Sequence, residues 1–193
     1  MTEIPEWRRK IIEQAEKVKA QPAKLGPNVN IEEFDLSAPD WKPVSTPDEL
    51  PKNVQEGANI VGIDAKENFR SGTYFQYDHT VILARALRDV PGAEIMSTSE
   101  ALKNYNWLKD YWWKAVSVDM DKYTAMAELK QTHGYFVRTK PNTRLTLPIQ
   151  ACLFIGTQGL LQCPHNVIIA EENSELHIIT GCTTALKREP GLH

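Results

Sequence analysis

Short β-type runs separated by turn residues fill the chain after Gly134, and they restrict its fold more than any other feature. The runs are YFVRT, RLTLPIQACLFI, LLQC, HNVIIA and ELHIIT, with PN, GTQG and EEN between them. β-branched and aromatic residues favour strands, and these turn residues end them. Strands that follow one another without an intervening helix exclude a βαβ sheet. The pattern leaves open an antiparallel sandwich and a parallel β-helix in which each coil covers the last.

The N-terminal part of the chain is predicted to contain one helix and a long connector. Apolar residues recur at three- and four-residue steps from Ile4 to about Ala20, which predicts an amphipathic helix. Between Gln21 and Val54 there are six prolines, and this density excludes a long helix or a central strand. We therefore expect an extended connector that runs along the surface.

The middle of the chain is predicted to mix strands and helices. β-branched and aromatic residues predict strands near residues 59–64 and 74–84, paired in a small sheet. Ser97 and Glu100 have the spacing of a capping box, which predicts a helix over about 98–115. A shorter helix is expected to start at Asp119 or Asp121 and to stop at Gly134.

Composition narrows the classes of partner and the cellular compartment. The 193 residues carry 22 basic and 25 acidic side chains, a net charge of −3, so we expect neither a nucleic acid nor an anionic membrane as partner. The sequence contains no apolar stretch of membrane-spanning length and no secretory leader at its start, which predicts a cytoplasmic protein. Three cysteines form no disulfide framework and are expected to be free thiols.

Cys182 is the cysteine whose environment leaves two interpretations open. Strand alternation places it on one face with Ile178 and Thr180, unless a bulge at Gly181 shifts the alternation, so a small buried side chain is the first interpretation. The second is a reactive thiolate, which needs a nearby cation to lower the pKa of the thiol. Three residues that follow are candidates for this role: Lys187, Arg188 and His193.

Metal ligation has little support in the sequence. Cys163 and His165 are two soft ligands at i and i+2, but no second pair at ligand spacing accompanies them, so no structural zinc site is predicted. There is also no four-cysteine run of the ferredoxin type, and we expect no all-thiolate cluster site of local spacing in this chain alone.

A family resemblance rests on long runs of residues. DKYTAMAELKQTHGYFVRTKPNTRLTLPIQACLFI and HNVIIAEENSELHIITGCTTALKREPGLH resemble the core of the SufB and SufD family of iron–sulfur cluster assembly proteins. VGIDAKENFRSGTYFQYDHT and MSTSEALKNYNWLKDYWWKAV resemble the N-terminal part of its shorter, archaeal-type members. The similarity extends from about residue 57 to the end.

The resemblance implies an α+β fold, in which a mixed helical and small-sheet N-terminal region precedes the first coils of a right-handed parallel β-helix. The expected divisions are a helix and proline-rich connector over 1–56, a mixed region over 57–133 and the start of the β-helix core over 134–193. Members of the family are usually about twice as long, so we expect this chain to be truncated within the core. The residues that would ligate a cluster and the helices that would dock an ATPase are then absent from it.

The resemblance also implies a function. Gly181-Cys182-Thr183 matches the step that favours SufB over SufD and that makes Cys182 a candidate sulfur acceptor, with His193 as a candidate accessory residue. The implied partners are a SufC-type ATPase, a second SufB or SufD subunit and a cysteine desulfurase system as sulfur donor. The iron–sulfur cluster would be transient in the assembled complex and not stably bound by this chain, which would itself be no enzyme. Open strand edges predict a homo- or hetero-oligomer.

Two alternatives to this function remain. The first is a truncated fragment that serves only as a protein-interaction module. The second is a small thiol-dependent enzyme that uses Cys182 with His193 or His177 as its base. Strand alternation places His177 on the face opposite Cys182, which argues against that pair.

Overall fold

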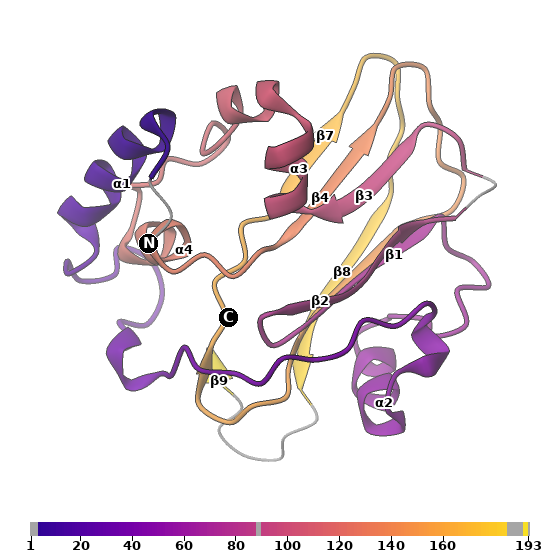
Figure 1. Ribbon diagram of the computed structural model, residues 1–193, viewed down its shortest axis with the longest axis horizontal. Coiled ribbons are helices and arrows are strands. Elements are labelled where there is room, and N and C mark those ends of the chain that lie inside the picture. Colours follow the sequence, from indigo (N-terminus) through magenta and orange to yellow (C-terminus); the bar gives the residue numbers. More distant parts are fainter. Residues whose placement is uncertain (1–3, 88–89, 185–190, 193) are drawn as a thin grey trace.

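The computed structural model describes residues 4–87, 90–184 and 191–192, and it combines helices with three small sheets (Figure 1). The mixed α+β class expected from the sequence is confirmed. The helices are α1 (Glu6–Val18), α2 (Lys52–Ile60), α3 (Thr98–Asn104) and α4 (Lys122–Leu129), with 3-10 turns η1 (Ile31–Glu33), η2 (Pro47–Glu49) and η3 (Asn106–Asp110). The strands are β1 (Gly72–Tyr77), β2 (Thr80–Ala86), β3 (Ala93–Ser97), β4 (Tyr135–Thr139), β5 (Ile149–Ile155), β6 (Leu160–Leu161), β7 (Val167–Ala170), β8 (Ile178–Thr184) and β9 (Gly191–Leu192).

Parallel pairing dominates the C-terminal strands. The sheet orders are β2-β1-β5-β8, β3-β4-β7 and β6-β9. β4 pairs with β7, β5 with β8 and β6 with β9, each in parallel. In every case the partner strand lies about 30 residues further along the chain, the length of one structural repeat in many solenoids. Among the described strands, β1 pairs with β2 and β3 with β4 in the antiparallel sense.

One core cluster lies between the four-stranded sheet and the β3-β4-β7 sheet (Figure 1). Tyr74 and Leu153 enter it from the first sheet, and Ile95, Tyr135 and Val137 from the second. The outer face of the four-stranded sheet is covered by α2, whose Val54 and Ala58 pack with Phe75 and Phe154. Every residue of β1 and β5 is therefore buried, because both faces of these strands are covered.

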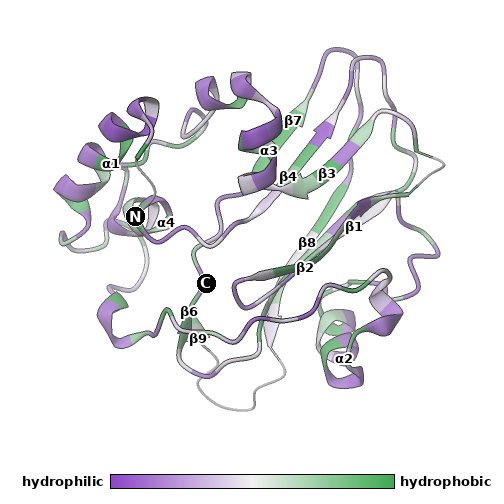
Figure 2. Cartoon of the chain, viewed as in Figure 1, coloured by the Kyte–Doolittle hydropathy of each residue, from purple (hydrophilic) through white to green (hydrophobic). Residues whose placement is uncertain are grey.

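Helices also cover the outer face of the β3-β4-β7 sheet. Leu108, Trp112 and Phe136 form a cluster there, and Trp7 of α1 packs against it. The helix predicted from Ile4 to Ala20 is confirmed as α1, which is largely hydrophilic in Figure 2 and buries one stripe that includes Ala15. Amphipathic periodicity therefore located this helix correctly.

The strand predicted over 59–64 is wrong, because α2 (Lys52–Ile60) covers its first two residues and a turn and irregular chain follow over 61–64. Pro51 stands at the N-cap of this helix, and Val54 and Ala58, four residues apart, form its buried side. Packing of this side on the sheet outweighs the β propensity of the residues around Ile60. The predicted connector over 21–54 is mainly irregular, although η1 and η2 lie within it and α2 begins before its end.

The strand predicted over 74–84 is a hairpin of β1 and β2. Asp78 stands in the turn with φ 50°, a left-handed conformation that Asp tolerates better than most residues. Its buried carboxylate accepts hydrogen bonds from the Trp41 indole (3.0 Å) and from the backbone N–H of Gly156 (2.7 Å). The turn is thereby anchored to both the connector and the end of β5.

The two later helices are shorter than predicted. The helix expected over 98–115 ends at Asn104, where Tyr105 takes an extended conformation and its ring packs near Phe136. The following residues form η3 and turns. The next helix begins after Asp121, whose side chain accepts from the Tyr123 N–H. Asp121 also forms a capping box with Thr124, whose hydroxyl accepts from the Asp121 N–H at 3.0 Å. This helix ends at Leu129, before Gly134.

Candidate functional site

Cys182 lies on β8, the edge strand of the four-stranded sheet. It is opposite Leu153 in the parallel register with β5, and Ile178 is opposite Ile149. The register continues through Gly181 without a shift, so no bulge interrupts the alternation. Cys182 therefore shares the face of Ile178, which points toward the β3-β4-β7 sheet. The thiol is exposed, and the interpretation of Cys182 as a buried side chain is wrong, because no described strand covers this edge of the sheet.

The residue before Cys182 must be small. A Cβ atom built on Gly181 would lie 2.6 Å from Cγ2 of Val61, which follows α2. Glycine thus lets β8 approach the chain at the end of α2. On the other face, Tyr135 of β4 reaches toward the strand, and its hydroxyl donates to the Thr180 hydroxyl at 3.4 Å. Cys182 lies two residues further along the same face.

Electrostatics around Cys182 favour the neutral thiol. Although the residue is exposed, protein atoms flank the sulfur, and this desolvation raises the pKa of the Cys182 thiol. Burial also raises the pKa of the Tyr135 phenol, and the nearby Cys182 raises it further, while the bond to Thr180 lowers it. A cation that approached Cys182 would increase its thiolate fraction.

The other two cysteines are buried. Cys152 is opposite Gly181 in the register with β5 and packs in the cluster under α2. Burial raises the pKa of its thiol strongly, and it raises the pKa of Cys163 to about 11. The charge of Lys130 lowers the pKa of Cys163, but burial outweighs it, and a buried neutral thiol is inert. Cys182 is consequently the cysteine that solvent can reach.

The remaining residues singled out from the sequence do not join Cys182 in the described structure. His193, Lys187 and Arg188 lie outside the described residues. His177 is exposed and pairs with Glu175 at 3.1 Å. His165 packs against the rings of two tryptophans. No group of three or more histidine, cysteine, aspartate or glutamate residues able to hold a metal occurs in the described ranges.

A buried polar cluster around Glu128 was not predicted. The Glu128 carboxylate accepts hydrogen bonds from the indole N–H groups of Trp112 (2.9 Å) and Trp113 (2.7 Å) and forms an ion pair with Arg8. The His165 ring packs against both tryptophan rings in tilted contacts, with centroids 3.9 and 4.2 Å away. Burial, followed by the charge of Arg8, lowers the pKa of His165 to about 4. Sequence reasoning missed Glu128 because Arg8 is 120 positions away.

Comparison with known proteins identifies the family. No protein-family model matches the chain. A curated iron–sulfur cluster assembly SufBD family protein of Methanothermobacter thermautotrophicus (strain Delta H) is 44% identical over 190 residues, which are 96% of this chain and 46% of the relative. The chain belongs to the SufBD family. A SufBD family protein of Archaeoglobus fulgidus is 40% identical over 67% of the chain and 34% of the relative.

More distant SufBD relatives also match. The iron–sulfur cluster assembly protein SufB of Bacillus subtilis is 25% identical over 76% of this chain and 32% of its own length. This SufBD chain spans about half the length, or less, of the curated relatives it matches. In its described part, no helix is long and apolar enough to cross a membrane.

Proposed function

We propose that this chain is a SufB-like component of an iron–sulfur cluster assembly scaffold and that Cys182 accepts sulfur for it. The observation that carries the proposal is the position of Cys182: it is the exposed cysteine of a SufBD family chain, on an edge strand, whereas Cys152 and Cys163 are buried. The names of the relatives support cluster assembly as the process. The role of the chain is that of a scaffold and not of a catalyst.

The proposed chemistry is transfer of sulfane sulfur. The Cys182 thiolate attacks the outer sulfur of a donor persulfide, R–S–SH, and the S–S bond of the donor breaks. Cys182 becomes a persulfide, Cys–S–SH, and the donor leaves as the thiolate R–S⁻. No external oxidant or reductant is needed. Since desolvation raises the pKa of Cys182, a cationic surface on the donor would promote the attack.

The proposed architecture for the C-terminal part is a right-handed parallel β-helix. Three parallel pairs support it, because β4, β5 and β6 in chain order are matched by β7, β8 and β9 in the same order. In this arrangement the first three strands form one coil and the next three form the following coil. Cys182 then lies on the inward face of the second coil, and its thiol is exposed because β8 is the edge strand among the described residues.

The proposed partners follow from the SufBD family. They are a SufC-type ATPase, a second SufB or SufD subunit that makes the chain part of an oligomer, and a cysteine desulfurase system in the cytoplasm. The iron–sulfur cluster is cargo, held transiently by the assembled complex. His193 is proposed as an accessory residue of the sulfur site.

The experiment that tests the proposal is site-resolved sulfur loading. The reduced protein is incubated with a cysteine desulfurase and cysteine, and digested peptides are weighed by mass spectrometry. We expect the mass of one added sulfur atom on the Cys182 peptide and none in the Cys182→Ser variant. Cys163→Ser is the matched control, because Cys163 is buried, and it should load like the wild type. Equal loading of Cys182→Ser would overturn the role of Cys182 and leave the protein-interaction module as the better account.

A further inference from the structure

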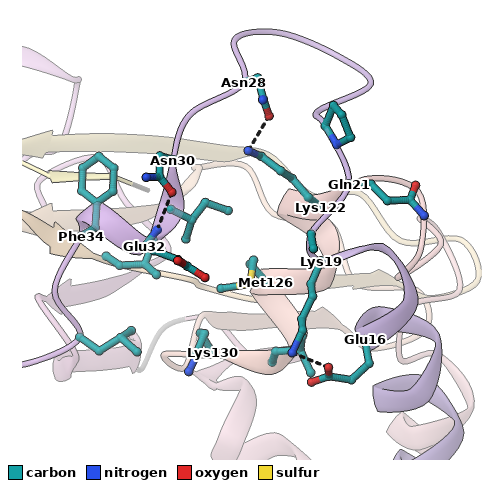
Figure 3. A pocket seen from close by; sticks show the side chains of 16 residues that line it. Glu16, Lys19, Gln21, Asn28, Asn30, Glu32, Phe34, Lys122, Met126 and Lys130 are labelled. Carbon is teal, nitrogen blue, oxygen red and sulfur yellow. Dashed lines mark hydrogen bonds and ion pairs between the residues drawn. The ribbon is translucent and has the colours of Figure 1, made fainter.

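A second site lies far along the chain from Cys182, where residues 28–36 pass over α4 beside the end of α1 (Figure 3). The pocket has a volume of about 670 Å³, within the range of roughly 300–1,000 Å³ typical of small-molecule sites. None of its lining residues belongs to the cysteine site. Its apolar lining comes from the connector, α4 and β6: Ile31, Phe34, Met126, Leu129 and Leu161.

One end of the pocket holds a buried cation. Lys122 is only 8% exposed, and its ammonium donates to Asn28 Oδ1 (2.6 Å) and to the Val29 carbonyl. Both acceptors are neutral, and the Tyr123 ring, 5.1 Å from Nζ, is neutral as well. Among the ion pairs of the described residues, none involves Lys122. An ammonium has three donors, and burial of a charge without a counter-charge is costly, so this end favours an anion.

The other charged residues that line the pocket do not cancel its preference for an anion. Lys19 and Glu16 form an ion pair with each other, at 2.5 Å. Lys130 and Glu32 also line the pocket, and both are exposed. Three lysines and two glutamates thus line the pocket. Of these lysines, Lys122 is the buried one, and no ion pair of the described residues joins it to a carboxylate. In Figure 3, Met126 lies between Lys122 and the end with Lys130.

We propose that this pocket binds an amphipathic organic carboxylate. Its head group would accept a hydrogen bond from the Lys122 ammonium, and its aliphatic body would lie on Met126 and Ile31. The charge supplies orientation, and burial of the aliphatic body supplies affinity. This assignment is independent of the proposed sulfur chemistry, since the two sites share no residue.

The probes for the test are sodium octanoate and octan-1-ol, which share a chain length and differ in head-group charge. Methionine labelled with ¹³C at the ε-methyl group reports binding by NMR, because Met126 lines the pocket and Met96 lies in the cluster beside α3. We expect octanoate to shift the Met126 signal saturably and to leave Met96 unchanged. Octan-1-ol should bind at least about tenfold more weakly, as the loss of one charged hydrogen bond implies.

Lys122→Gln removes the charge and keeps an N–H donor for the connector. We expect it to weaken octanoate binding about tenfold and to leave octan-1-ol binding unchanged. Lys109→Gln in η3, outside the pocket, is the control and should bind octanoate like the wild type. Equal affinity of the wild type for both probes, or no saturable shift of Met126, would overturn the proposal, and neither result depends on how well the variant folds.

Discussion

Arg8 of α1 and Glu128 of α4 form an ion pair in which the glutamate side chain is fully buried. Removal of one partner from a buried pair leaves the other charge uncompensated. We therefore expect Glu128→Gln to lower the free energy of unfolding by about 3 kcal/mol, measured by urea denaturation. Glu6→Gln is the control: it breaks the exposed Glu6–Arg9 pair and should cost less than about 1 kcal/mol. Equal losses in the two variants would show that the buried pair contributes no more than a surface pair.

His165 should make the stability depend on pH. Its pKa is lowered from 6.5 to about 4 in the folded protein, so the unfolded chain takes up a proton first as the pH falls. The contribution of neutral His165 to the free energy of unfolding is fully present above about pH 6.5. It is lost progressively as the pH falls toward 4, by up to about 1.4 kcal/mol per pH unit.

The measurement for His165 is urea unfolding at about pH 7 and about pH 5. The wild type should lose more stability between the two than His165→Gln, which cannot titrate. His177→Gln, a change at an exposed histidine, should behave like the wild type. Burial also lowers the pKa of His133. Because all three proteins keep His133, its effect on stability is the same in each and does not change the comparison. An identical pH dependence in His165→Gln would contradict the assignment.

Alkylation should distinguish the three cysteines. With iodoacetamide at about pH 8, the native protein should be modified at Cys182, because this thiol is exposed. Cys152 and Cys163 should react only after unfolding in urea, since both are buried and have raised pKa values. Peptide mass spectrometry reads the sites, and Cys182→Ala should stay unmodified under native conditions. Rapid native labelling of Cys152 would show that the sheet under α2 opens.

The contact between Gly181 and Val61 predicts a rescue experiment. Gly181→Ala places a Cβ 2.6 Å from Cγ2 of Val61, and this overpacking should cost about 1–3 kcal/mol in the free energy of unfolding. Val61→Ala removes the atom in conflict, so the double variant should be more stable than the sum of the two single changes predicts. Purely additive losses in the urea-derived free energies would show that the two residues do not compete for space.

Elements with a long and regular pattern were predictable. The apolar periodicity of α1 and the β-branched runs of β4, β5 and β7 each specify their own local structure, because the periods of helix and strand differ. The capping side chain of Asp121 likewise marked the start of α4. Where local signals were short, as around Ile60, propensity favoured a strand and packing on the sheet produced a helix.

Some features of the candidate site were also predictable from the sequence, and others depend on the tertiary structure. The sequence by itself placed Gly181-Cys182-Thr183 in a β-type run, because alternation is a local property of a strand. The unshifted register with β5 then showed that Cys182 shares a face with Ile178. Only the tertiary structure decided that Cys182 is exposed and that Cys152 and Cys163 are buried, since exposure depends on which strand lies at the sheet edge and which helix covers it. It also decided that Glu128 meets Arg8 and that Lys122 faces a pocket, because chain segments about 90 to 120 residues apart come together only when the whole core is packed.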